Sequence, residues 1–325
     1  PLTRDEVVEL VDTVRDRPLG LDRDRGVRLS LAGMQDKLLL HRPTRSRVYY
    51  RPLHGAPSTY ILKPPPPPTA DDGLRTPGLV ANEAFCLHLA AAVRLPTAEC
   101  RVERFGDNDT LVVRRFDRDF STNPVGRLHQ EDLVAAMGRD PHLKYERSNE
   151  KLETVAGGFA ERRPIRSDPG PTLDDIADLL RRHVGSGSLL RLAEIVTFNV
   201  AIGNADAHAR NLSVALDRDG GVRLAPLYDL VATRYYDGLA SDAAQSVDGV
   251  VEIDSIRASN LVAHGARWGL PEATVRTRVG DVLKRIEQTI SAAVESTVRS
   301  GAEPNDVEGV AEFIRSRVTG LLDDF

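Results

Sequence analysis

The residues best suited to chemistry in this chain are Asp206 and Asn211, in the stretch Gly-Asn-Ala-Asp-Ala-His-Ala-Arg-Asn over residues 203–211. An aspartate followed by four residues and an asparagine is a spacing used for phosphoryl transfer. That reaction needs a carboxylate to orient the acceptor hydroxyl and oxygen ligands to hold Mg²⁺ on the phosphates. Asp206 suits the first task and Asn211 suits the second.

Two other interpretations of this stretch stay open on its residues alone. Gly, Asn and Asp after a helix are also typical of a helix C-cap followed by a turn. Asp206 and His208 are spaced like a metal-binding pair of a hydrolase. The chain has only 8 His residues, however, and no second His/Asp cluster at ligand spacing, which disfavours a zinc or two-metal site.

The residues that follow predict a second carboxylate beside Asn211. Leu212–Leu216 and Val222–Leu227 are short apolar runs separated by an Asp/Gly-rich turn signal, which predicts a hairpin. The hairpin would bring Tyr228 and Asp229 back to Asn211. Asp229 would then complete a metal site.

A phosphate-binding turn and a lysine are expected upstream. Ala32 and Gly33 lie in a small-residue turn before the apolar run Leu38–Leu40, where backbone N–H groups can approach phosphate oxygens. Ser58–Lys63 is a β-rich run that ends in Lys63. Taken alone, Lys63 also fits a solvated lysine at a strand end.

A partner for Lys63 is expected on the next element. Leu79–Leu95 contains few helix-breaking residues and would place Glu83, Leu87 and Ala90 on one helix face. A carboxylate among apolar neighbours is unfavourable unless it is paired, so we expect Glu83 to pair with Lys63. A glutamate favoured in the first turn by the helix dipole is the alternative.

Eight segments in a fixed order give the chain a family resemblance. They are Ser30–Lys37, Ile61–Lys63, Asn82–Ala90, Arg115–Arg118, Leu128–Asp132, Lys144–Glu146, Phe198–Asn211 and Pro226–Asp229. On these segments the chain resembles the HipA-type serine/threonine kinases, the toxins of bacterial toxin–antitoxin modules. The resemblance implies an α+β, bilobal, protein-kinase-like fold, with a small mixed lobe over residues 1–118 and a mostly helical lobe over residues 119–325.

The resemblance also implies roles for individual residues. Asp206 would be the catalytic aspartate, Asn211 and Asp229 the metal ligands, and Ser30 a regulatory serine that the kinase phosphorylates on itself. The ATP contacts would be Ala32, Gly33, Met34, Gln35, Asp36, Lys37, Lys63, Glu83, Arg114, Arg115, Phe116, His208, Ala209, Arg210, Asn211, Tyr228 and Asp229. Arg114 replaces the glutamate expected at the hinge that holds adenine, which is compatible with a contact through the backbone.

The function implied by the resemblance is an ATP- and Mg²⁺-dependent serine/threonine kinase that acts as a toxin. Its target would be an aminoacyl-tRNA synthetase, and its partner a helix-turn-helix antitoxin through which DNA is bound indirectly. Only 29 residues precede Ser30, which resembles the short, HipT-like subtype whose N-terminal subdomain is replaced by a separate small protein. A pseudokinase binding module, and a weak kinase-fold module that acts mainly as a co-repressor, stay open as alternatives.

Composition sets further bounds. With 325 residues and 41% hydrophobic content, the chain can fill the cores of a two-lobed unit. A net charge of −5 argues against strong direct binding to nucleic acid. No apolar run approaches the ~18 residues of a membrane span, so we expect a cytoplasmic protein. Cys86 and Cys100 are expected to be free thiols.

The remaining elements follow from apolar periodicity. Thr3–Arg15 predicts an amphipathic helix whose apolar stripe would form part of a partner surface, unless it packs on the chain's own small lobe. Lone Trp268 is expected in the core, and residues 161–171 and 237–249 are expected to be loops. Helices are expected over Gln130–Met137, Thr172–His183, Ser188–Ile202, Glu272–Val298 and Val307–Leu322.

Overall fold

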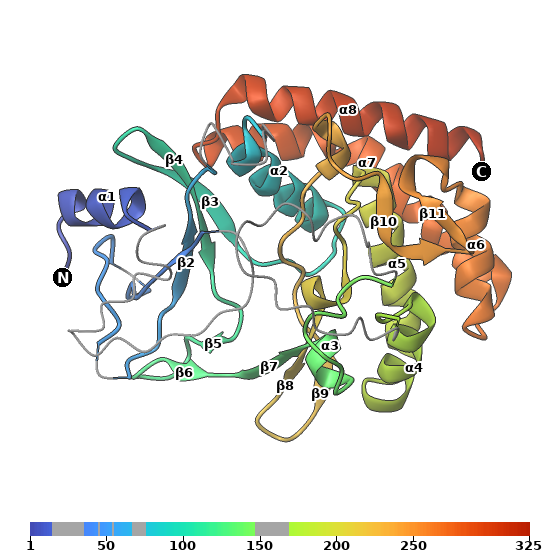
Figure 1. Ribbon diagram of the computed structural model, residues 1–325, viewed down its shortest axis with the longest axis horizontal. Helices are drawn as coiled ribbons and strands as arrows, with labels where there is room; N and C mark the ends of the chain where they lie inside the picture. The colour runs from blue at the N-terminus through green and yellow to red at the C-terminus, as the bar shows by residue number, and fades with distance from the viewer. Residues whose placement is uncertain (15–35, 45, 54, 67–75, 147–168) are drawn as a thin grey trace, which may run out of the picture.

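The computed structural model describes residues 1–14, 36–44, 46–53, 55–66, 76–146 and 169–325 (Figure 1). A sheet with a helix at its outer end forms one half of the molecule, and a set of helices forms the other (Figure 1). The long helices α7 (Glu272–Arg299) and α8 (Pro304–Asp323) pack along each other at the edge of the helical half. Ser30 and residues 32–35, which carry part of the expected nucleotide loop, lie outside the described residues.

The sheet half is built on four antiparallel strands in the order β1-β2-β4-β3. Their bounds are Leu38–Leu40 for β1, Tyr60–Lys63 for β2, Cys100–Phe105 for β3 and Asn108–Arg114 for β4. Leu62 pairs with Val112 across β2 and β4, and both side chains are fully buried. β2 is a central strand that ends at Lys63, and the pairing of Lys63 with Leu111 of β4 fixes the position of the lysine backbone.

Helix α1 (Arg4–Asp12) covers one end of this sheet (Figure 1). A capping box between Thr3 and Glu6 starts the helix. The apolar stripe of α1 and Val14 are buried against side chains of β1, β2, β3 and β4, in a cluster that includes Tyr49 and Phe105. Of the two outcomes expected for the stripe in Thr3–Arg15, the structure shows the second, because the chain's own sheet covers the stripe and leaves none of it for a partner.

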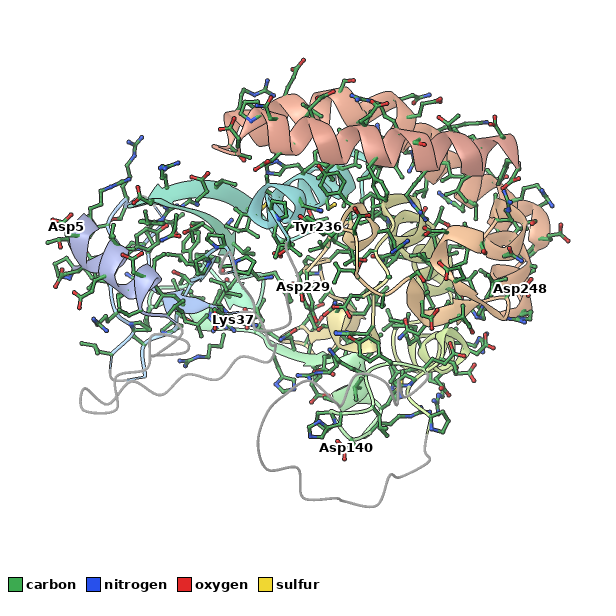
Figure 2. All side chains as sticks on the ribbon, turned by 45° about the horizontal axis from the view of Figure 1, so that its top comes forward. Asp5, Lys37, Asp140, Asp229, Tyr236 and Asp248 are labelled. Carbon is green, nitrogen blue, oxygen red and sulfur yellow. The ribbon has the colours of Figure 1, made fainter. Side chains whose placement is uncertain are left out.

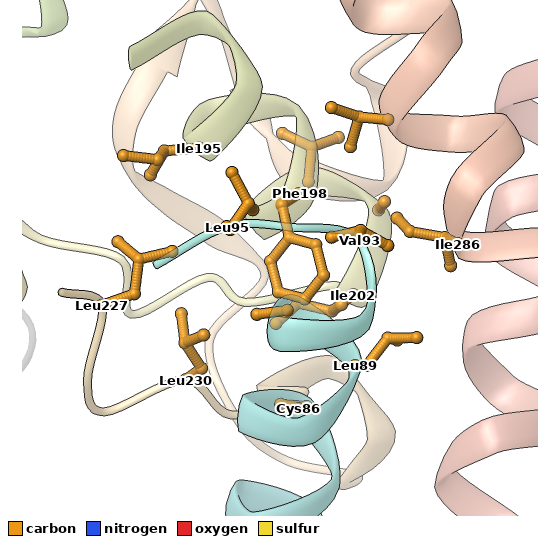
Figure 3. Packing of buried hydrophobic residues seen from close by; sticks show 14 of the residues in the cluster. Cys86, Leu89, Val93, Leu95, Ile195, Phe198, Ile202, Leu227, Leu230 and Ile286 are labelled. Carbon is orange, nitrogen blue, oxygen red and sulfur yellow. The ribbon is translucent and has the colours of Figure 1, made fainter. Parts of the chain in front are cut away.

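Helix α2 (Leu79–Ala92) belongs to the packing of both halves. It contacts β3 and β4 on one side and α7 and α8 on the other. Figure 3 shows Phe198, from the helical half, surrounded by Leu89, Val93 and Leu95 from α2 and the residues after it. A shared apolar core of this kind limits relative motion of the elements that carry the site.

The helical half also contains α4 (Leu173–His183), α5 (Gly187–Ile202) and α6 (Ala258–Arg267). Four of the five helices expected after residue 119 are confirmed to within a few residues, namely those matching α4, α5, α7 and α8. Trp268 is 5% exposed, which confirms its place in the core. Helix α6 was not expected from the sequence.

Three small antiparallel sheets complete the described chain. The first pairs β5 (Arg118–Asp119) with β6 (Gly126–Arg127), the second orders β7 (His129–Asp132), β8 (Ser213–Leu216) and β9 (Val222–Leu224), and the third pairs β10 (Asp242–Val247) with β11 (Val250–Glu252). Short 3-10 turns in this part of the chain lie at Ala209–Asn211, Thr233–Tyr235 and Ile253–Ser255. The β8–β9 pairing confirms the predicted hairpin.

Two local predictions are wrong. Only Leu133–Ala136 (α3) of the expected helix over 130–137 is helical, because the preceding residues pair with β8 from a distant part of the chain. The expected loop at 237–249 contains β10, which turns into β11 through Asp248 and Gly249, both at positive φ. Asp-Gly is a strong hairpin signal. Residues 161–168 lie outside the described part, and residues 169–171 form neither helix nor strand.

Two further properties bear on the class of protein. None of the helices in the described ranges is long and apolar enough to cross a lipid bilayer. Cys86 and Cys100 are free thiols, as expected. Burial raises the pKa of Cys100 to about 12, so this thiol carries little thiolate at neutral pH.

Candidate active site

A cavity of about 1160 Å³ contains most of the described candidate residues. Its walls come from β2, α2 and β4 on the sheet half and from the Asp206 loop and the segment around Asp229 on the helical half. In Figure 2, Lys37 and Asp229 lie at the junction of the two halves. The volume exceeds the roughly 300–1,000 Å³ usual for small-molecule sites, so it leaves room for a nucleotide and an acceptor group.

Lys63 joins the two halves of the cavity. Its Nζ donates to Glu83 Oε1 at 2.7 Å and to Asp229 Oδ1 at 2.7 Å. Glu83 is 2% exposed on α2, and a buried carboxylate needs such a partner. The predicted pairing of Lys63 with Glu83 is therefore confirmed.

Lys63 and its two carboxylate partners stabilise each other's charged forms. Burial by itself would lower the pKa of Lys63, but Asp229 and Glu83 together outweigh that effect and raise it. Lys63 in turn lowers the pKa of Asp229. Lys63 therefore stays positive and Asp229 negative over the neutral range. Asp229 has a positive φ of 58°, a left-handed conformation that aspartate adopts more readily than bulky residues.

The Asp206 loop follows directly from the end of α5. Gly203 caps this helix at a positive φ of 69°, and a Cβ atom there would lie 3.1 Å from the Arg317 side chain, so glycine is favoured. Asn211 Nδ2 donates to the Asp206 carbonyl oxygen at 2.9 Å, and the His208 N–H donates to the same oxygen at 2.8 Å. These bonds fix the loop and leave Asn211 Oδ1 available as an oxygen ligand.

The Asp206 carboxylate meets a residue to which the sequence assigned no chemistry. The Tyr145 hydroxyl donates to Asp206 Oδ1 at 2.6 Å, while the Asp206 side chain is 49% exposed. His208 lies nearby, with Nε2 3.9 Å from the same oxygen, and burial lowers the pKa of His208. The carboxylate is thus anchored on one oxygen and open to the cavity.

The donors present fit a magnesium ion. Asn211 and Asp229 both line the cavity, and because Lys63 bonds to Oδ1 of Asp229, its Oδ2 is the remaining carboxylate oxygen. In the described residues no group of three or more His, Cys, Asp or Glu side chains is placed to hold a metal. Few protein ligands, completed by phosphate oxygens and water, are usual for Mg²⁺ at a nucleotide.

Part of the cavity lining is apolar. Ile61, Leu87 and Val113 belong to it, and the Phe116 ring stacks on Tyr228 with centroids 5.7 Å apart and planes 25° apart. The Tyr228 hydroxyl is held by the Arg210 carbonyl oxygen at 2.8 Å. An apolar slot with aromatic rings beside it suits a planar base.

The two arginines assigned to the hinge use their side chains within the protein. Arg114 pairs with Glu99 at 2.9 Å and lies over the Phe120 ring. Arg115 donates twice to Asp117, at 2.9 and 2.6 Å. Both residues line the cavity, so a contact to a base through their backbone stays open and one through their guanidinium groups is disfavoured.

The other candidate residues differ in their relation to the cavity. Lys37, His208 and Arg210 line it, and burial followed by the charge of Lys63 lowers the pKa of Lys37. Ala209 is fully buried in the core and does not line the cavity, and Asp36 does not line it either. The remaining nucleotide-loop candidates, Ala32, Gly33, Met34 and Gln35, and the regulatory candidate Ser30 lie outside the described residues.

Sequence reasoning assigned no chemistry to Gln130, Asp132, Lys144 and Tyr145, which also line the cavity. The sequence did single these residues out, because they lie in the segments 128–132 and 144–146 that carry the family resemblance. Nothing in their spacing, however, shows that they line the same cavity as Asp206, since strand pairing between β7 and β8 and contacts with β10 bring them there.

Comparison with known proteins places the chain in a family. A family model described as the HipA-like C-terminal domain matches residues 29–290. The chain belongs to this HipA-like family. It is 33% identical over 300 residues to "Putative kinase Y4mE" of Sinorhizobium fredii, covering 91% of this chain and 64% of that protein. It is 27% identical over 299 residues to the serine/threonine-protein kinase toxin HipA of Shewanella oneidensis, covering 90% of this chain and 64% of the toxin.

Two solved structures support the fold. HipA of Shewanella oneidensis, solved with HipB and operator DNA, superposes with a TM-score of 0.74 at 24% identity, covering 99% of this chain and 73% of that one. The Helicobacter pylori kinase CtkA gives a TM-score of 0.50 at 14% identity, covering 81% of this chain and 88% of that one. The expected α+β, kinase-like fold is confirmed. The chain spans about 64% of the length of the two curated relatives.

Proposed function

We propose that this HipA-like chain is a serine/threonine protein kinase that uses ATP and Mg²⁺ and acts as the toxin of a toxin–antitoxin pair. One observation carries the proposal. Lys63 reaches Glu83 and Asp229 at once, at 2.7 Å each, in the cavity that Asp206 and Asn211 also line. This combination of a paired lysine, an acceptor-orienting carboxylate and oxygen ligands is what phosphoryl transfer requires.

The charges of the cavity support binding of ATP. The apolar slot beside Phe116 and Tyr228 takes the adenine, and Lys63 with Lys37 faces the phosphates. Asn211 and Asp229 would hold Mg²⁺, which would neutralise charge on the transferred group. The buried pair with Glu83 holds Lys63 in place before ATP arrives, which lowers the entropy lost on binding.

Asp206 acts on the acceptor. Its carboxylate accepts a hydrogen bond from a serine or threonine hydroxyl and takes the proton as the hydroxyl oxygen attacks the γ-phosphorus. The bond between that phosphorus and the β–γ bridging oxygen breaks, and ADP leaves. The acceptor becomes a phosphate monoester, so atoms and charge balance.

The biological assignment rests on the relatives. A curated relative is named a serine/threonine-protein kinase toxin, and the similar HipA structure contains HipB and operator DNA. By analogy we assign an aminoacyl-tRNA synthetase as target, Ser30 as a self-phosphorylation site, and a helix-turn-helix antitoxin as partner. A separate small protein in place of an N-terminal subdomain stays a prediction.

A transfer assay tests the proposed function. Purified chain is incubated with [γ-³²P]ATP and Mg²⁺, and label on protein serine or threonine is measured for wild type, Lys63→Met and the control Lys284→Met, whose lysine is exposed on α7. Wild type and the control should transfer phosphate, whereas Lys63→Met should lose nearly all transfer, and EDTA should stop it. Absence of any transfer by wild type, or full activity of Lys63→Met, would contradict the proposal.

A further inference from the structure

Tyr145 makes the kind of bond to Asp206 that an acceptor hydroxyl must make. Its hydroxyl donates to Oδ1 of Asp206 at 2.6 Å, a short bond to a charged acceptor. The other oxygen, Oδ2, belongs to a side chain that is 49% exposed in the cavity. One carboxylate oxygen is therefore held by the protein, and the other is open to an acceptor.

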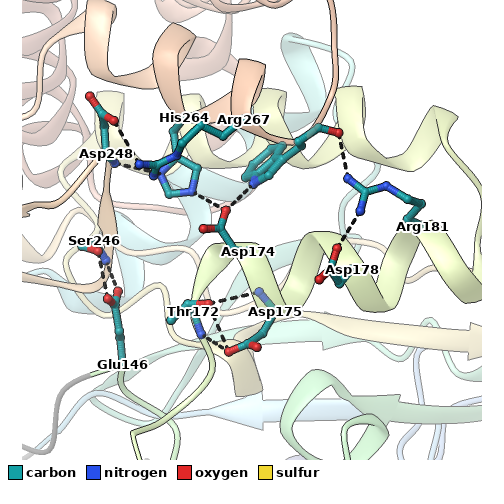
Figure 4. Close-up of polar contacts among 11 residues, drawn as sticks. Glu146, Thr172, Asp174, Asp175, Asp178, Arg181, Ser246, Asp248, His264 and Arg267 are labelled. Carbon is teal, nitrogen blue, oxygen red and sulfur yellow. Dashed lines mark hydrogen bonds and ion pairs between the residues drawn. The ribbon is translucent and has the colours of Figure 1, made fainter.

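The residues on both sides of Tyr145 hold it in this position. The Glu146 carboxylate accepts from the Ser246 N–H at 2.5 Å and from the Ser246 hydroxyl at 2.9 Å (Figure 4). The Lys144 ammonium lies 4.6 Å from the centroid of the Tyr145 ring, and the His208 ring packs edge-on at 5.3 Å. Moving Tyr145 away from Asp206 would break these contacts.

A single residue of β10 sets the register of both partners. The Ala244 carbonyl oxygen accepts from the N–H of Glu146, next to Tyr145, at 2.9 Å. The Ala244 N–H donates to the carbonyl oxygen of Ala205, next to Asp206, also at 2.9 Å. The backbone beside the tyrosine and the backbone beside the aspartate are therefore both hydrogen-bonded to Ala244. The fold itself thus brings the two side chains together.

We propose that Tyr145 is a positioning residue that holds Oδ1 of Asp206 and thereby turns Oδ2 toward the acceptor hydroxyl. This role rests on the proposed kinase function and deepens it. Burial, followed by the charge of Asp206, raises the pKa of Tyr145, so the hydroxyl keeps the proton that it donates. A carboxylate fixed before the substrate arrives needs no reorganisation during transfer.

The test compares Tyr145→Phe with Tyr50→Phe, which removes a hydroxyl from the sheet half, away from the cavity lining. The rate of transfer from [γ-³²P]ATP to the chain itself and to dephosphorylated casein is measured at varied ATP. A hydrogen bond to a charged group corresponds to roughly a 10- to 100-fold effect. Tyr145→Phe should therefore lower kcat by about that factor and leave the KM for ATP and the Tm nearly unchanged, whereas Tyr50→Phe should behave as wild type.

A second variant keeps the tyrosine and loosens its anchor. Ser246→Ala removes one of the two bonds to Glu146, so it should lower kcat less than Tyr145→Phe and again spare the KM for ATP. This intermediate effect is expected only if the placement of Tyr145 matters. A residue that merely supports folding would change kcat, KM and Tm together.

Several results would overturn the positioning role. An unchanged kcat in Tyr145→Phe would show that the hydrogen bond from Tyr145 to Asp206 does not contribute to transfer. A raised kcat would show that Tyr145 blocks Asp206. Phosphate on Tyr145 itself, found by mass spectrometry, makes it an acceptor instead. If wild type transfers no phosphate, the proposed function fails and the positioning role fails with it. A double-mutant cycle on the Tm, using Tyr145→Phe and Asp206→Ala, then shows separately whether the contact exists.

Discussion

Lys63 and Asp229 are 166 residues apart in the chain, yet Lys63 Nζ lies 2.7 Å from Asp229 Oδ1. The lysine ends a central strand of the sheet half, and the aspartate follows the β8–β9 hairpin of the helical half. Their contact joins the two halves in the cavity, where phosphates are proposed to bind. The third member, Glu83, comes from α2, which packs against both halves.

Glu83→Gln should weaken ATP binding. The substitution keeps the size of the side chain but removes the charge that holds Lys63, while Asp229 continues to attract the lysine. A charge-assisted bond supports roughly a tenfold or larger effect on the dissociation constant, measured by calorimetry with MgATP. The control is Glu287→Gln, an exposed residue of α7. An unchanged dissociation constant would show that the Lys63–Glu83 pair is not used in binding.

The sequence predicted the Lys63–Glu83 pair and the hairpin because each depends on a short pattern. A β-rich run ends in Lys63, a continuous helix follows with Glu83 among apolar residues, and two apolar runs flank an Asp/Gly turn. The contact of Tyr145 with Asp206 could not be read in this way. It depends on the backbone bonds of Ala244 in β10, a segment expected to be a loop.

The error at residues 130–132 has the same origin. Gln130 and Asp132 have no strong strand preference, and they extend because β8 offers its edge to them. The sequence also could not show what covers the apolar stripe of α1, since an amphipathic helix can pack on its own lobe or on a partner. The position of the four-stranded sheet beneath it decided the outcome.

Phosphorylation of Ser30 should inhibit the enzyme. A phosphate there would add roughly −1.5 to −2 charges close to the turn residues Ala32 and Gly33, which are proposed to approach the phosphates of ATP. Intact-mass measurement should find phosphate on the wild-type chain and none on the Asp206→Asn variant. The Ser30→Ala variant, which keeps Asp206, should also carry no phosphate. Equal phosphate on wild type and Asp206→Asn would indicate another kinase, and none on either would exclude the switch.

Protonation of His264 should destabilise the fold in mild acid. Its Nδ1 accepts the Asp248 N–H at 2.7 Å, so its Nε2 carries the hydrogen toward Asp174 (Figure 4). Burial, together with the charge of Arg267, lowers the pKa of His264 in the fold. In the unfolded chain the histidine has its ordinary pKa of about 6.5, so it takes up a proton at a higher pH than in the folded chain. The free energy of unfolding therefore decreases as the pH falls from about 6.5 to the lowered pKa of the folded state.

The measurement for His264 is the Tm between pH 7.5 and 5. Wild type should lose more stability over this range than His264→Gln, which cannot take up the proton. His183→Gln, an exposed residue at the end of α4, serves as the control and should follow wild type. Parallel curves for wild type and His264→Gln would show that His264 does not contribute to the acid sensitivity.

The comparison of Asp206→Asn with Asp229→Asn tests the central claim most directly, because the two aspartates lie in one cavity and are assigned different tasks. Phosphate transfer and MgATP affinity are measured for both variants. Asp206→Asn should lose transfer and keep MgATP affinity, since it removes the acceptor-orienting carboxylate and preserves shape. Asp229→Asn should also weaken MgATP binding, since a charged metal ligand is lost. Near-normal transfer by Asp206→Asn would contradict the account.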